Sequence, residues 1–159
     1  MTVYCPSMSS AIVLSTGSGL SKAARVTSSA EEEALRHYLA PRAESLVSEI
    51  EEILIESGIT AARTDEWTPI NRATANAAMA FTLLLPRSLP PPEIAPEADG
   101  EISFDWLGPS GKMFSVSVNG HGRLAYAGSF GWRSKVHGTE QLSDSCPPEI
   151  IVGISKTYS

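Results

Sequence analysis

The residues best suited to acid–base chemistry lie near the C-terminal end of the chain. His137 stands in a glycine-bounded stretch with Arg133 before it, and the carboxylates of Glu140 and Asp144 follow. A histidine can act as a general base when a carboxylate orients its ring. The group therefore defines a hydrolase hypothesis in which His137 works with Glu140 or Asp144, and with Arg133. Plain surface histidines are far more common than tuned ones, so these four residues are candidates only and no catalytic function is favoured.

Two other patterns each lack a necessary part. Glu101 and Asp105 share one face of a predicted strand, but four strand residues separate them by roughly 13 Å. Paired carboxylates of glycosidases lie about 5–9.5 Å apart, which excludes that chemistry. Residues 15–19 form a glycine-containing loop before Lys22. The Gly-Lys-Ser/Thr sequence and the third glycine of nucleotide-binding loops are absent from it, so chance explains the pattern.

Composition and charge narrow the remaining classes. The formal net charge is −6, and ten of the 18 acidic residues lie within residues 29–66. A chain with this balance is not expected to bind nucleic acid, since that depends on clustered Lys and Arg. The two cysteines, Cys5 and Cys146, are far apart and match no disulfide framework or zinc site. We therefore expect no metal and no cofactor.

Hydropathy points to a cytoplasmic protein. No apolar stretch reaches the length of a membrane span, and the N-terminus lacks the pattern of a signal peptide. Residues 1–28, rich in Ser and Thr, are expected to form a mobile tail, and Met8 is an alternative start. The rest, 29–159, has the length and apolar content of one α+β domain.

The domain is expected to place helices before a sheet. Its predicted parts are helices within 30–85, a proline-rich strap over 86–96, a sheet over 101–130, and a C-terminal loop with a short helix over 131–159. Pro41 breaks the first helix, which begins near Ala30. A fourth strand over 150–154 is the alternative to the terminal helix.

Two helices have clear signals. One buries a stripe at helical spacing and ends at Gly58; the stripe consists of Leu46, Val47, Ile50, Ile53 and Leu54. The next is capped by Asn71 and ended by Pro86. Its inward face is predicted to consist of Ala73, Ala77, Ala80, Phe81 and Leu84.

Period-two alternation predicts the sheet. In three segments, 102–106, 114–118 and 124–126, large apolar residues at even positions alternate with small or polar residues at odd positions. Turns at 108–111 and 120–122 can both have odd lengths, so these side chains can share one face of a three- or four-stranded antiparallel meander. The other face is flat and weakly polar, and it either stays solvated or docks a partner.

The interaction candidates lie on or near this flat face. They are Asp105, Ser115, Ser117 and Arg123, together with Trp132 beyond the last predicted strand. A different possibility is a small-ligand site, for which Trp106, Tyr126 and Trp132 would have to line an apolar pocket.

From Trp67 onward the chain shows a longer pattern. Its parts are Trp67, Pro69-Ile-Asn71, Leu84-Leu-Pro86, Pro90–Pro92, Asp99-Gly-Glu-Ile102, Asp105-Trp106, Ser115-Val-Ser117, Gly122–Tyr126 and His137-Gly-Thr139. In these parts it resembles a group of small bacterial proteins of uncharacterised function, often found near mobile elements. That resemblance implies a bacterial or phage origin and supplies no catalytic residue. In the group a Gly-Tyr pair follows the tryptophan, whereas here Thr68-Pro69 follows directly.

These observations predict a non-enzymatic protein-interaction module that acts as a regulatory or inhibitory partner, either antitoxin-like or anti-defence. The expected partner is another protein rather than nucleic acid or a membrane. The hydrolase and the small-ligand-binding domain stay open as alternatives.

Overall fold

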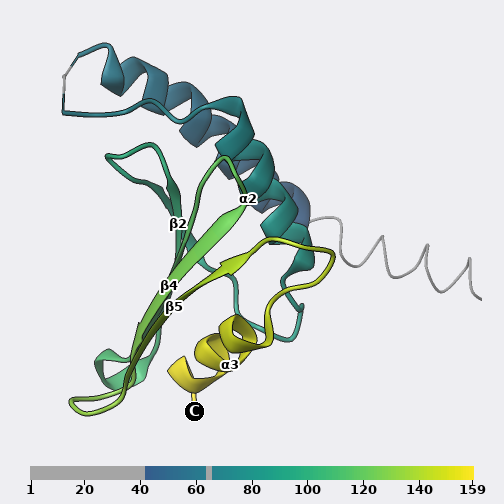
Figure 1. Ribbon diagram of the computed structural model, residues 1–159, viewed down its shortest axis with the longest axis vertical. Coiled ribbons are helices and arrows are strands. Elements are labelled where there is room, and N and C mark those ends of the chain that lie inside the picture. The colour runs from purple at the N-terminus through teal and green to yellow at the C-terminus, as the bar shows by residue number, and fades with distance from the viewer. Residues whose placement is uncertain (1–41, 64–65) are drawn as a thin grey trace, which may run out of the picture. The chain divides into compact units, whose positions relative to one another are not determined.

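The computed structural model describes residues 42–63 and 66–159. All of them belong to one compact unit, residues 40–159. The expectations for a tail over 1–28, a helix from Ala30 and a break at Pro41 fall outside the described residues. Within them the α+β class is confirmed, because helices precede a five-stranded antiparallel sheet and a short helix follows it (Figure 1).

The described elements run in simple order. A helix covers residues 42–61. After it come α2 (Arg72–Leu84), β1 (Glu93–Pro96), β2 (Ile102–Leu107), a 3-10 turn (Pro109–Gly111), β3 (Met113–Val118), β4 (Arg123–Ser129), β5 (Lys135–Gln141) and α3 (Pro148–Thr157). The strands lie in the sheet in the order of the sequence, so every neighbour is joined by a hairpin.

The register confirms the predicted alternation. Trp106 pairs with Phe114, and Val116 pairs with both Phe104 and Tyr126. The turn after β3 has three residues, with Gly122 at φ +73° and its N–H donating to the Asn119 carbonyl at 3.0 Å. The length and the left-handed glycine agree with the expected turn. Its odd length keeps the even-numbered side chains of β3 and β4 on one face.

The helices cover that apolar face. α2 packs on β2 and β3, and α3 packs on β2, β3 and β4. Phe81 of α2 meets Phe104 edge to face, with ring centroids 5.0 Å apart. At Gly153 of α3 an added Cβ would lie 2.1 Å from the ring of Phe114. Only glycine lets the helix approach the sheet this closely.

The helix over 42–61 buries the predicted stripe. Leu46, Ile50 and Ile53 are buried in the same core as the sheet residues. Its first described residue contacts the proline-rich segment, because the Arg42 guanidinium donates to the Leu89 carbonyl at 2.8 Å. The predicted end at Gly58 was wrong, since the helix continues to residue 61. Glycine is tolerated inside the helix because packing of the apolar stripe outweighs its low propensity.

The α2 helix begins as predicted and faces another way. Asn71 caps it by accepting from the Thr74 N–H at 2.8 Å. Its buried residues are Thr74, Ala75, Ala78, Phe81 and Thr82. Of the predicted inward residues only Phe81 is fully buried. Alanine carries little hydrophobic signal, so the face follows the large Phe81 ring rather than the alanines.

The sheet is larger than predicted. The last residues of the expected strap form β1, and part of the expected C-terminal loop forms β5. Both lie at sheet edges, where each needs only one neighbour to form. β5 shows little hydrophobic alternation because Gly138 and Glu140 occupy positions of its inner face. The helix over 148–157 confirms the short terminal helix, and the alternative strand over 150–154 was wrong.

A substitution at Gly58 tests whether the helix continues to residue 61. Nothing lies within 4 Å of a Cβ added there, and its φ is not left-handed. We expect Gly58→Ala to raise the free energy of unfolding by about 0.5–1 kcal/mol, because alanine restricts the unfolded chain and favours a helix. Urea denaturation measures the change.

The matched control is Gly153→Ala, where the added methyl group meets Phe114. This variant should lower the free energy of unfolding by roughly 1–3 kcal/mol through overpacking. A Gly58→Ala protein less stable than wild type would contradict the helical assignment.

Candidate functional site

The face of the sheet away from the helices carries most of the predicted interaction residues. We call it the open face; it consists of the odd-numbered residues of the five strands, with Glu97 and Glu101 continuing it at the β1–β2 turn. The described helices all lie on the other side of the sheet (Figure 1). In the middle of the open face, β3 and β4 carry only serine and alanine, so no large side chain projects from it and the surface is flat.

Asp105, Ser115 and Ser117 are brought together there, as predicted. The Asp105 carboxylate accepts from Ser103 at 3.1 Å and from the hydroxyl of Ser115 on the neighbouring strand. Ser117 donates to Glu101 at 2.8 Å. The serine hydroxyls therefore hold the carboxylates in fixed positions and satisfy part of their hydrogen-bonding capacity within the sheet.

Arg123 and Trp132 are separated from that group. Arg123 lies on the open face but at the start of β4, and its side chain is exposed. Trp132 lies in the turn between β4 and β5, with 83% of its surface exposed and the Arg133 guanidinium 4.5 Å from its ring centroid. Sequence alone could not place Trp132 in a turn between two strands, because β5 was not predicted.

Charge divides the open face into two halves. The strands β1 and β2 with their turn carry five carboxylates and no cation, on Glu93, Glu97, Asp99, Glu101 and Asp105. The strands β4 and β5 carry no carboxylate on this face and present Arg123, Lys135 and His137, all exposed. We call these the acidic half and the basic half.

The acidic half contains a potential cation site. One carboxylate oxygen each of Glu97, Asp99 and Glu101 lies within 4.8 Å of the others. Three oxygen ligands of this kind suit Ca²⁺ or Mg²⁺, although exposed acidic groups often lie together without an ion. Partial burial raises the pKa of Glu97; the nearby Ser117 hydroxyl opposes this rise, and the charges of Asp99, Glu101 and Asp105 add to it. The sequence signal for this cluster is the row of acidic residues at alternate positions 97, 99 and 101, which the spacing of Glu101 and Asp105 alone does not reveal.

The outer edge of β5 is open. Phe130 N–H bonds to Ser134 O at 2.7 Å and Leu142 N–H to Gly122 O at 2.7 Å, which shows that even-numbered residues bond β5 to β4. Antiparallel pairs alternate, so the odd residues point their N–H and C=O groups outward. They are Lys135, His137, Thr139 and Gln141, and no described strand lies on the side of β5 opposite to β4.

The opposite edge, on β1, is blunted. Glu97 N–H bonds to Glu101 O at 2.9 Å, so the odd residues of β1 face β2 and the even residues face outward. Of these outward positions, Pro92 and Pro96 have no N–H to offer. Short edge strands with proline resist pairing with another chain. The two edges therefore differ, and only β5 presents a regular row of free donors and acceptors.

The hydrolase residues are not assembled. His137 lies on the open face, whereas Glu140, three positions later on the same strand, lies on the helix-covered side. His137 is exposed, and within the described residues it has no hydrogen-bond or ion-pair partner. Asp144 lies in the following loop and Arg133 stacks on Trp132. This arrangement does not provide the carboxylate that a general base needs for orientation.

The aromatic residues of the ligand-site hypothesis are also apart. Trp106 is 1% exposed, and its indole N–H donates to the Pro90 carbonyl at 2.9 Å. Tyr126 stacks on Phe114 with centroids 5.8 Å apart, within the packed apolar face. Trp132 is exposed in its turn, so the three rings line no common pocket.

Cys146 is a packing residue. It is a free, buried cysteine of the core, and burial raises the pKa of its thiol to about 11. A thiol with so high a pKa is poorly nucleophilic at neutral pH.

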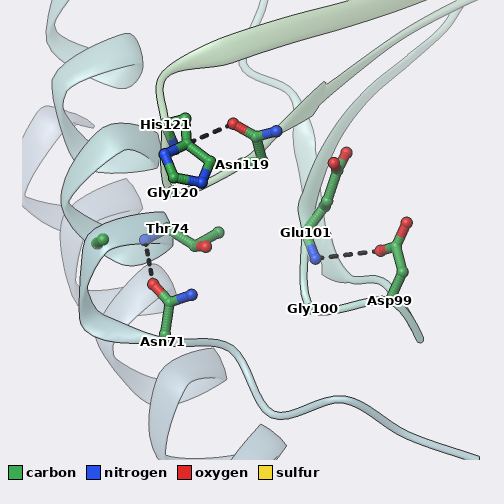
Figure 2. A pocket seen from close by; sticks show the side chains of 9 residues that line it. Asn71, Thr74, Asp99, Gly100, Glu101, Asn119, Gly120 and His121 are labelled. Carbon is green, nitrogen blue, oxygen red and sulfur yellow. Dashed lines mark hydrogen bonds between the residues drawn. The ribbon is translucent and has the colours of Figure 1, made fainter.

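A small polar pocket lies at the other end of the strands from Trp132. It has a volume of about 230 Å³, between the first turn of α2 and two hairpin turns (Figure 2). Asn119 accepts there from the N–H groups of His121 and Arg123, at 3.0 and 3.1 Å. The Thr74 side chain is 2% exposed, and its hydroxyl bonds to no described residue. Such a pocket can hold water or a small polar molecule.

Comparison of the chain with models of protein families, with curated proteins and with solved structures finds no match. Within the described residues, no helix combines the length and the apolar character that crossing a membrane requires.

Amide hydrogen exchange tests the orientation of β5. We expect the N–H groups of Val136, Gly138 and Glu140 to exchange about tenfold or more slowly than those of His137 and Thr139, because only the former bond to β4. Residue-resolved exchange measured by NMR gives the rates. Uniform protection along the strand would contradict an open edge.

Glu97 predicts a pH dependence of stability. Its pKa is raised in the folded protein, so the ionised carboxylate disfavours folding at neutral pH, and this penalty disappears as the pH falls through the raised pKa. We expect Glu97→Gln to be more stable than wild type near pH 7, and the difference to shrink by about pH 4. Denaturation at both pH values measures it, with Glu93→Gln as the control from the same strand. An advantage for Glu97→Gln that grows on acidification would contradict the assignment.

Proposed function

We propose that the protein is a non-enzymatic interaction module that binds an extended segment of a partner protein along β5. The observation that carries the proposal is the open edge, where four consecutive odd-numbered residues direct their backbone groups away from the sheet. An extended segment adds to such an edge through backbone hydrogen bonds, and its side chains determine specificity. The contrast with the blunted β1 edge supports β5 as the site.

The side chains along the edge indicate which segments fit. A strand added to β5 would place every second side chain beside Lys135, His137 and Thr139 on the open face. Lys135 is a cation at one end of this row, and no carboxylate lies on the open face of β4 or β5. A partner segment with an acidic residue near Lys135 is therefore favoured.

The regulatory role rests on two further observations. No catalytic group is assembled within the described residues, and the resemblance to small bacterial proteins near mobile elements favours a bacterial or phage context. We propose that the module inhibits or regulates its partner by occupying a strand, in the manner of an antitoxin or an anti-defence factor. The proposal includes a cytoplasmic location and no direct role for nucleic acid or membrane.

A proline substitution in β5 tests the proposal. Thr139→Pro removes an outward N–H without removing a bond to β4, and proline is tolerated at this kind of edge position. Thr139→Val changes the side chain to a similar extent and keeps the N–H, which makes it the matched control. We expect a partner captured from the source cells to bind wild type and Thr139→Val alike, and Thr139→Pro about tenfold or more weakly.

Exchange measurements on the complex complete this test. The N–H groups of His137, Thr139 and Gln141 should become protected when the partner is bound. Equal binding of the partner to Thr139→Pro and to wild type would show that the partner uses another surface. If the wild-type protein hydrolyses a substrate and His137→Ala does not, the hydrolase would be favoured instead.

A further inference from the structure

The open face combines exposed apolar side chains with small central residues, which is typical of a surface that binds another protein surface. Leu107 and Met113 pair across β2 and β3 at one end of it, and they are 57% and 43% exposed. Its central residues are serines and alanines, which allow another sheet to approach closely. The carboxylates of Asp105 and Glu101 already accept serine hydroxyls, which lowers the cost of removing them from water.

We propose that the open face binds the open face of a second copy of this chain, so that two sheets stack into a dimer. The argument is charge complementarity between the acidic half and the basic half. The second copy is related to the first by a half turn about an axis that lies between the two sheets and runs parallel to β3. Its β4 then lies over β2 of the first copy, and its β5 lies over β1. Such a two-fold contact is isologous and closes on itself. It leaves the outer edge of β5 free for a partner, so it does not depend on the proposed function.

The register of the sheet shows which residues would face one another. Glu97, Glu101, Asn119, Arg123 and Gln141 form one row across the five strands. The half turn about β3 reverses this row, so Glu101 faces Arg123 of the second copy and Glu97 faces its Gln141. The contact occurs twice because of the symmetry.

The other rows give the same result. Glu93, Asp105, Ser115, Ala127 and His137 form the row nearer the middle of the strands. When it is reversed, Glu93 faces His137 and Asp105 faces Ala127, so no carboxylate meets a carboxylate. At the apolar end Met113 faces its own equivalent, and Leu107 lies beside it. Stacked sheets rotate by about 30°, which shifts these pairs but preserves the match of the two halves.

A partner of uniform charge would match only one of the two halves of the open face. An acidic protein would be repelled by the acidic half, and a basic protein by Arg123 and Lys135. A copy of the chain matches both halves at once. The net charge of −6 on each chain opposes association at long range, but this repulsion is screened by salt beyond about 8–10 Å.

A charge exchange tests the dimer. Sedimentation equilibrium of the full chain should show a reversible monomer–dimer equilibrium. Glu101→Arg and Arg123→Glu should each weaken the dimer by about tenfold or more, and the double variant should recover most of the affinity because the pair is restored in reverse. Glu56→Arg makes the same change of charge on an exposed helical residue and should leave the dimer unchanged.

A second variant guards against loss of folding. Met113→Asp lies on an exposed position of the open face and would place two carboxylates together on the symmetry axis. We expect it to be monomeric with an unchanged far-ultraviolet circular dichroism spectrum. A wild-type chain that stays monomeric up to about millimolar concentration would overturn the proposal. A dimer unaffected by both single reversals and by Met113→Asp would also overturn it, since the contact would then lie elsewhere.

Discussion

The alternation of side chains across the sheet is the constraint on which the rest of this structure depends. A strand places successive residues on opposite faces, and an odd turn between β3 and β4 carries this parity from one strand to the next. The turn at 120–122 holds its length because Gly122 adopts a left-handed conformation. One residue more or less would move Phe114 and Trp106 relative to Leu124 and Tyr126, and the apolar layer under the helices would divide between two faces.

The same parity determines the surface. Because most large apolar residues of the sheet take the even positions, the odd positions are left mainly with small and charged residues, and these form the open face together with Leu107 and Met113 at one end. The parity also controls the backbone, since the odd residues of β5 are the ones that direct their N–H and C=O groups outward. A single rule of geometry therefore produces the packed core, the divided charge of the open face and the free edge.

The two edge strands of the sheet, β1 and β5, differ in their ability to pair with another strand. Proline at positions 92 and 96 closes the β1 edge, while β5 has none. The proline-rich segment also joins the layers, since the carbonyls of Leu89 and Pro90 accept from Arg42 and Trp106. Residues that read in the sequence as a stiff connection thus contribute a strand, a blocked edge and two contacts to the core.

The sequence by itself determined the elements whose signals are local. The alternation of β2, β3 and β4, the cap at Asn71, the stripe from Leu46 to Ile53 and the α+β class follow from side-chain spacing, because burial on one face requires it. Only the tertiary structure decided the existence of β1 and β5, the inward face of α2 and the separation of His137 from Glu140. Edge strands form because a neighbour supplies hydrogen bonds. A helix rich in alanine takes the orientation that buries its largest side chain, which in α2 is Phe81. Both depend on residues distant in the chain, which local spacing cannot express.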